Sequence, residues 1–225
     1  MELSGCQNDM NSLEPLMKSC DVDVTKKFSI TRNEVLSFFE EAKKLRSIDT
    51  LYFCYSGHGT QISSNIESDK MSEALVFWNG GPSYELLYDR ELKSLVSELA
   101  CKVVVYLDSC FSGGMTKSLA GIVLDVTNPI KQKFTIQNPA MQIPNDIKSK
   151  EIIISKNRQC FMTACQENET AIDLGSNGAF TAGFLKAWSQ NKRTVTTIMK
   201  KVISECKRYQ KPKLEMINQS SVKLF

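Results

Sequence analysis

Apolar residues fall into two patterns along the chain, compact runs and longer stretches with three-to-four spacing. Compact runs lie at Leu51–Tyr55, Val103–Leu107 and Gln159–Cys165. Such runs predict strands that are buried on both faces of a parallel sheet. Shorter stretches with strand character lie at Cys20–Val24, Ala74–Trp78, Leu214–Ile217 and Val222–Phe225.

Helices are predicted between these strands. Thr31 and Glu34 form a capping-box pattern, and the helix that follows has an apolar stripe for the core: Val35, Leu36, Phe38, Phe39, Ala42 and Leu45. Further helices are predicted over residues 9–18, 89–99, 179–190 and 194–208. Strands that alternate with helices predict an α/β fold, with a mostly parallel sheet covered on both faces.

Polar segments separate some of these elements. Residues 61–72 are rich in Ser, Asn and charged residues, so we expect an exposed loop there. Asn79–Pro82 has the composition of a turn. Residues 115–158 mix Lys, Gln, Asn and Pro, and a loop of that length is typically functional or mobile.

Composition narrows the class of protein. A chain of 225 residues with 42% hydrophobic residues can form one domain with a sizeable core. The net charge of +3 is mild and the lysines are scattered, so we expect no nucleic-acid partner. No stretch reaches the roughly 18 apolar residues that a membrane span needs, and no basic-then-apolar signal region begins the chain. We therefore expect a monomeric cytoplasmic protein with no membrane association.

The cysteines do not indicate a metal site. The chain has eight cysteines, no C-x-x-C pair and one histidine, a pattern that does not favour structural zinc. Cys54 and Cys160 lie within apolar runs and are interpreted as small buried hydrophobic residues.

Two reactive side chains follow the ends of predicted strands. His58 follows the strand at Leu51–Tyr55, and Cys110 follows the strand at Val103–Leu107 after Asp108-Ser109. Open α/β sheets collect their chemistry at the carboxyl ends of strands. A neighbouring imidazole can take the proton of a thiol and make it nucleophilic. The pair therefore indicates a cysteine nucleophile with a histidine base, provided that the two strands are neighbours.

The motifs around these residues resemble a known family. A strand ending in SGHG at Ser56–Gly59, followed 52 residues after the histidine by the cysteine of DSCFSG, resembles the caspase-like cysteine peptidases. The DSC motif and the GCQND stretch at Gly5–Asp9 resemble the metacaspase branch. The resemblance implies a caspase-like three-layer sandwich over residues 1–225. It divides the chain into a large-segment part (1–114), a linker (115–158) and a small-segment part (159–225).

The resemblance also implies roles for individual residues. His58 and Cys110 would be catalytic, and backbone N–H groups of Gly59 and Cys110 would form the oxyanion hole. The pocket for the residue before the cleaved bond would be lined by Cys6, Asp9, Ser56 and Asp108. Two carboxylates there favour Arg or Lys in a protein or peptide substrate. Simpler interpretations remain open: Asp9 as a helix cap, Asp108 as a turn residue, and the glycines as turn formers.

The chain departs from the family pattern in two places. Metacaspases have a strand immediately before the GCxND motif, and here GCQND begins at Gly5. We therefore expect unpaired edges on the neighbours of the absent strand. Many relatives bind an activating calcium ion, but the corresponding positions hold only Glu67, Asp69 and Glu73, with Lys117 after the nucleophile. Since calcium takes six to eight oxygen ligands, we expect no cofactor and weak or no calcium activation.

The sequence is thus consistent with two functions. The first is a cysteine endopeptidase of metacaspase type, and the alternative is an inactive caspase-like module for binding or regulation. The seven basic residues between Lys117 and Arg158 fit either self-cleavage in the linker or a solvated loop with no such role.

Overall fold

The computed structural model describes residues 4–63, 71–81, 83–109, 131–132, 157–166, 169–189, 194–220 and 224. The helices are α1 (Ser4–Lys18), α2 (Arg32–Lys44), α3 (Asp89–Ser97), α4 (Ala179–Trp188) and α5 (Val195–Cys206). The strands are β1 (Thr50–Gly57), β2 (Gly59–Ser63), β3 (Met71–Trp78), β4 (Tyr84–Tyr88), β5 (Lys102–Ser109), β6 (Lys131–Gln132), β7 (Gln159–Thr163), β8 (Ile172–Asp173) and β9 (Lys213–Ile217). Among these residues no helix is both long and apolar enough to cross a membrane.

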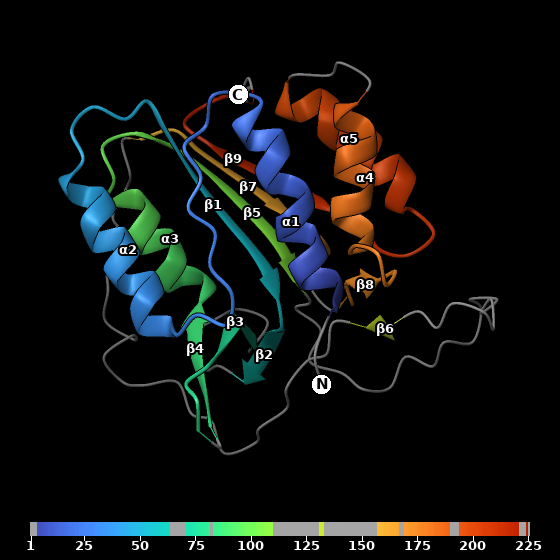
Figure 1. Ribbon diagram of the computed structural model, residues 1–225, viewed down its shortest axis with the longest axis horizontal. Coiled ribbons are helices and arrows are strands. Elements are labelled where there is room, and N and C mark those ends of the chain that lie inside the picture. The colour runs from blue at the N-terminus through green and yellow to red at the C-terminus, as the bar shows by residue number, and fades with distance from the viewer. Residues whose placement is uncertain are drawn as a thin grey trace.

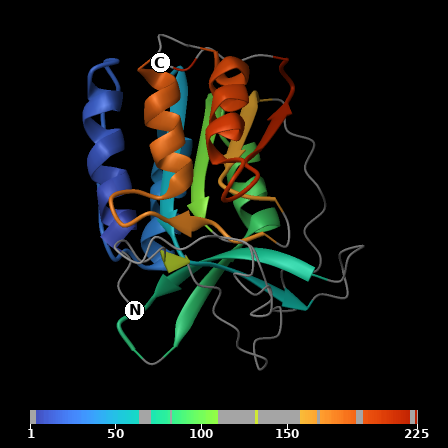
Figure 2. The same ribbon diagram turned by 90° about the vertical axis from the view of Figure 1, so that its right-hand side faces the viewer.

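A four-stranded sheet forms the centre of the fold, in the order β1-β5-β7-β9. The pairs β1/β5 and β5/β7 are parallel, and β7/β9 is antiparallel. Helices α2 and α3 cover one face, and α1, α4 and α5 cover the other (Figures 1 and 2). This arrangement confirms the predicted α/β class with a mostly parallel sheet between two helical layers.

Strand β5 is buried along nearly its whole length because helices pack on both faces of the central sheet (Figure 1). Every residue from Val103 to Ser109 is buried. On one face the ring of Tyr106 stacks on Phe180 of α4, with centroids 4.7 Å apart. On the opposite face Phe53 of β1 contacts Phe39 of α2 at 5.2 Å. An apolar core on each side thus holds the strand that leads to Cys110.

A second sheet lies across the end of the molecule where β1 and β5 finish (Figure 2). Its strands are antiparallel in the order β2-β3-β4. The prediction of a loop over residues 61–72 is wrong at both ends, because Gly59–Ser63 pairs with Met71–Leu75. Hydrogen bonds across the hairpin hold these polar residues in strands, which apolar patterning does not reveal. Residues 64–70 lie outside the described part.

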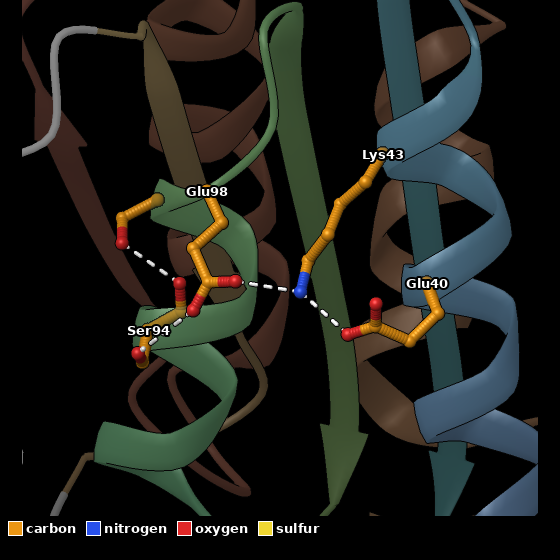
Figure 3. A network of polar contacts seen from close by, with 5 residues as sticks. Glu40, Lys43, Ser94 and Glu98 are labelled. Atoms are coloured by element: carbon orange, nitrogen blue, oxygen red, sulfur yellow. Dashed lines mark hydrogen bonds and ion pairs between the residues drawn. The ribbon is translucent and has the colours of Figure 1, made fainter.

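Polar contacts join α2 to the C-terminal end of α3, on the face of the central sheet that these two helices cover. The capping box at Thr31 and Glu34 is present as predicted. Near the other end of α2, Lys43 Nζ contacts Glu40 Oε1 at 2.5 Å and Glu98 Oε2 at 2.6 Å (Figure 3). The Glu40 side chain is 60% exposed, and partly exposed pairs of this kind contribute at most about 1 kcal/mol. These contacts therefore orient the two helices more than they stabilise them.

Several predicted boundaries differ from the structure. Cys20–Val24 forms no strand, because within the described residues it has no neighbouring strand to pair with. The first helix begins at Ser4 rather than residue 9, and the two C-terminal helices end at Trp188 and Cys206. Most of the candidate strand at 222–225 lies outside the described residues.

The apolar stripe of α2 is only partly in the core. Val35, Phe39 and Ala42 are buried as predicted. Phe38 is 38% exposed and Leu45 is 51% exposed, so the prediction of a core position is wrong for these two residues. Phe38 lies at the border of the stripe, where the face turned to the sheet gives way to solvent. Leu45 follows the last residue of α2 and has extended backbone, so it does not continue the stripe.

Strand β1 lies at the edge of the central sheet. Within the described residues its strand neighbour is β5 alone. The expectation about the strand before the GCQND motif therefore stays a prediction.

Candidate active site

His58 lies immediately after β1 and immediately before β2. Its carbonyl oxygen accepts a hydrogen bond from the Val76 backbone N–H at 3.1 Å and from the Tyr55 hydroxyl at 2.8 Å. The sole histidine is therefore attached through its backbone to β3 as well as to β1. The side chain is half-buried.

The register of β1 and β5 brings the ends of the two motif-bearing strands together. Gly57 pairs with Ser109 in the parallel ladder, and His58 and Cys110 are the next residues along each strand's direction. The sequence-based condition, that the two strands be neighbours, is confirmed. Cys110 itself lies outside the described residues, so its catalytic role and its oxyanion role remain predictions.

Asp9 of α1 is fully buried and lies in a ring of hydrogen-bond donors. Its Oδ2 accepts from the Ser56 hydroxyl at 2.6 Å. Its Oδ1 accepts from Asn177 Nδ2 at 3.1 Å and from the Gly178 backbone N–H at 2.8 Å. These donors come from β1 and from the segment that leads into α4. The structure therefore brings predicted pocket residues Asp9 and Ser56 into direct contact.

Asp108 of β5 is also fully buried. Its Oδ2 accepts from the Thr181 backbone N–H at 3.2 Å and from the Thr181 hydroxyl at 2.7 Å. The Thr181 oxygen lies 2.9 Å from the Tyr106 hydroxyl. Since the Thr181 proton goes to the carboxylate, Tyr106 donates to Thr181. Burial, and after it the charge of Asp108, raises the pKa of Tyr106 well above its ordinary value, which keeps the phenol a donor.

Both acids lie at the N-terminus of α4. Gly178 is the N-cap residue of this helix and Thr181 lies in its first turn, where backbone N–H groups lack partners within the helix and the dipole favours negative charge. Ser56 and Asp108 are register partners in adjacent strands, so their side chains leave the same face of the sheet about 5 Å apart. Asp9, Ser56 and Asp108 therefore form one cluster.

Helix α1 places Cys6 close to the cluster of Asp9, Ser56 and Asp108. It lies three residues before Asp9 on α1 and is half-buried, so the two side chains share one face of the helix. The four predicted pocket residues thus converge from α1, β1 and β5. Their role in substrate binding remains a prediction.

The structure adds residues that sequence reasoning did not identify. Asn177, Gly178 and Thr181 orient the two acids, and only Gly178 carried a local signal, as the residue before a helix. Asp173 is fully buried and accepts hydrogen bonds from the backbone N–H groups of Gly5 at 3.3 Å and Gly175 at 2.8 Å. The contact with Gly5 spans 168 residues of sequence, so no local pattern reports it.

Gly59, the other predicted oxyanion donor, begins β2, pairs with Leu75 and is buried. Of the candidate calcium positions, Glu73 lies on β3, where its Oε1 accepts from Gln61 Nε2 at 3.5 Å. Glu67, Asp69 and Lys117 lie outside the described residues. In the part of the chain that the structure describes, no three metal-ligating side chains gather at one place.

Comparison with known proteins assigns the family. The Caspase domain family model matches residues 1–224. The chain belongs to the caspase domain family. Its similarity to metacaspases agrees with the DSC and GCQND motifs. Among curated proteins it is 22% identical to Metacaspase-1 of Schizosaccharomyces pombe over 84% of this chain. It is 26% identical to Metacaspase-8 of Arabidopsis thaliana over 53% of this chain.

The chain spans only part of the length of these two relatives, 56% of the first and 35% of the second.

Solved structures support the caspase fold over nearly the whole chain. Protein GSU0716 from Geobacter sulfurreducens matches with a TM-score of 0.77 and 24% identity, over 97% of this chain and 86% of its own. Caspase-1 from Spodoptera frugiperda matches with a TM-score of 0.63 and 11% identity, over 96% and 79%. At these identities the structural likeness shows the fold alone.

Proposed function

We propose that this caspase-family chain is a cysteine endopeptidase of metacaspase type that cleaves peptide bonds after Arg or Lys. The observation that supports it is the pairing of Gly57 with Ser109. His58 and Cys110 each follow a paired residue by one step of about 3.8 Å along the backbone. Adjacent strands are about 4.8 Å apart, so both side chains start from one edge of the sheet.

In the proposed reaction His58 takes the thiol proton of Cys110, and the thiolate attacks the carbonyl carbon of the substrate. The carbonyl oxygen becomes an oxyanion. When the C–N bond breaks, the imidazolium gives its proton to the departing amine and a thioester remains on Cys110. Water then loses a proton to His58 and attacks the thioester. Protonation of the departing sulfur regenerates the thiol and releases the acid.

The oxyanion requires donors that no side chain obstructs. Gly59 lacks a side chain and is held at the start of β2 by its pairing with β3. Its backbone N–H is proposed to donate to the oxyanion together with that of Cys110. Removing one such donor from an enzyme typically slows turnover by about 10²–10³-fold.

The preference for Arg or Lys is proposed to come from Asp9 and Asp108. Each is fully buried and held by hydrogen bonds to neutral donors. A guanidinium or ammonium group offers hydrogen-bond donors together with the positive charge that compensates two carboxylates. An aspartate side chain would be repelled by the same pair.

Fluorogenic peptides ending in Arg, Lys or Asp test this proposal. We expect the wild-type chain to hydrolyse the Arg and Lys peptides and not the Asp peptide, and Cys110→Ala to be inactive. Cys101→Ala is a matched control at the opposite end of β5, where burial raises the pKa of the thiol. It is expected to retain activity. Equal activity of wild type and Cys110→Ala would contradict the proposal.

The alternative is a caspase-like module that binds a partner without turnover. One observation favours it, namely the position of β1 at the edge of the sheet within the described residues. An edge strand can pair with an extended segment of another chain. If the wild-type chain hydrolyses none of the three peptides, with or without calcium, this alternative is preferred.

A further inference from the structure

Tyr55 connects the end of β1 to β3 through a single hydroxyl group. Its oxygen lies 2.8 Å from the His58 carbonyl oxygen and 2.9 Å from the Val76 carbonyl oxygen. A phenol has one proton, so the donor is shared between the two carbonyls. Val76 also donates its backbone N–H to His58 at 3.1 Å. Tyr55 and Val76 thus hold the histidine carbonyl from two sides.

The position of the phenol is set by packing and by a glycine. The ring of Tyr55 contacts Phe77, with centroids 5.5 Å apart and planes at 60°. A Cβ atom added to Gly57 would lie 2.6 Å from the Tyr55 hydroxyl oxygen, which is closer than non-bonded atoms approach. The phenol therefore reaches His58 only because residue 57 has no side chain. Tyr55, Gly57 and His58 form one structural unit.

We propose that Tyr55 is a positioning residue for His58, an inference that rests on the proposed function of the dyad. The histidine follows the last residue of β1, and fixing its carbonyl oxygen restricts rotation of the backbone that directs its side chain. An imidazole must lie within hydrogen-bond reach of the thiol to take its proton. Displacement by about 1 Å in such a site can lower turnover about 100-fold. Tyr55 contacts the histidine backbone and acts on the reaction only through it.

Because the chain has one histidine, its imidazole can be observed without assignment in histidine-labelled protein by ¹H–¹³C NMR. Tyr55→Phe keeps the ring and its contact with Phe77 and removes the shared donor. We expect this variant to shift or broaden the His58 signals and to move the midpoint of their pH titration. The turnover number should fall about tenfold while KM stays within about twofold. Tyr52→Phe, in the same strand, is the control and should leave the His58 signals unchanged.

The His58 NMR signals and the peptidase activity together distinguish failure of the positioning role from failure of the proposed function. If wild type lacks peptidase activity but Tyr55→Phe alters the His58 signals, the proposed function fails and the positioning role stands. If wild type is active and the variant leaves both signals and turnover unchanged, the positioning role is overturned and the proposed function stands. If Tyr55→Phe does not fold, Gly57→Ala is used instead, because the added methyl group would displace the Tyr55 hydroxyl from the His58 carbonyl oxygen. Unchanged His58 signals in that folded variant would likewise overturn the inference.

Discussion

The Ser56 hydroxyl donates a hydrogen bond of 2.6 Å to the fully buried carboxylate of Asp9. This bond joins β1 to α1 two residues before the histidine. The same carboxylate accepts from Asn177 and from the backbone of Gly178, so one acid connects α1, β1 and the start of α4. A residue predicted to recognise substrate is therefore also part of the framework of the site.

Removal of the Ser56 hydroxyl is expected to weaken recognition of basic substrates. A hydrogen bond to a charged group contributes about 1.5–3 kcal/mol, so Ser56→Ala should lower kcat/KM for an Arg peptide by about tenfold or more. The effect should lie mainly in KM. Ser94→Ala, which alters the distant contact network of α3 in Figure 3, should leave both constants unchanged. A Ser56→Ala variant with wild-type kinetics would contradict a role for the Asp9 cluster in recognition.

Thr181→Val is expected to destabilise the fold. The substitution conserves shape but removes the hydroxyl that joins Tyr106 to Asp108, leaving a buried phenol without its acceptor. We expect the free energy of unfolding in urea to fall by about 1–3 kcal/mol. Thr197→Val changes an exposed position of α5 and should cost less than about 0.5 kcal/mol. Equal effects of the two variants would argue against a structural role for the buried chain of hydrogen bonds.

The helix after Thr31 could be predicted because its signals are local. The capping box and the buried positions Val35, Phe39 and Ala42 depend on residues three or four apart. The pairing of β1 with β5 was only a condition for the dyad, because compact apolar runs indicate buried strands but do not indicate which of them are adjacent. Cys20–Val24 was wrongly predicted as a strand because a strand requires a partner that its own sequence does not specify.

The donors around Asp9 and Asp108 were not predictable from local patterns. Asn177 contacts Asp9 across 168 residues of sequence, and Thr181 contacts Asp108 across 73. β4, at Tyr84–Tyr88, was also missed. It is short, and its place in a sheet depends on its pairing with β3. The types of residue in the site could thus be predicted, but the hydrogen bonds that orient them follow from tertiary structure.

Stability is expected to decline in alkaline solution. Burial raises the pKa of Cys160 to about 12 and that of Cys206 to about 12, whereas an unfolded thiol titrates near about 8.5. Between these values the unfolded chain releases protons that the folded chain retains. Each thiol should therefore lower the free energy of unfolding by about 1.4 kcal/mol per pH unit. At pH values below about 8 this dependence should vanish.

Cys160→Ala tests this assignment by urea denaturation between pH 8.5 and 11. The substitution should reduce the slope of stability against pH by about 1.4 kcal/mol per unit, whatever it does to stability at neutral pH. An unchanged slope would show that the Cys160 thiol does not retain its proton in the folded chain.

Calcium is expected to have little effect on turnover. Glu73 is the one candidate ligand of the acidic loop within the described residues, and its carboxylate accepts from Gln61. We expect hydrolysis of an Arg peptide to change by less than about twofold between chelator and millimolar calcium, since the ion needs six to eight oxygen ligands. Magnesium serves as the control. A severalfold rise at sub-millimolar calcium would refute this expectation.

The most direct test of the His58 and Cys110 pairing is the pH dependence of thiol alkylation. Iodoacetamide modification of Cys110, followed by mass spectrometry of the peptide that contains it, reports the fraction of thiolate. We predict half-maximal reactivity below about pH 7 in wild type and a shift toward about 8.5 in His58→Ala. The same midpoint near about 8.5 in both proteins would contradict the account, because the imidazole would then have no influence on the sulfur.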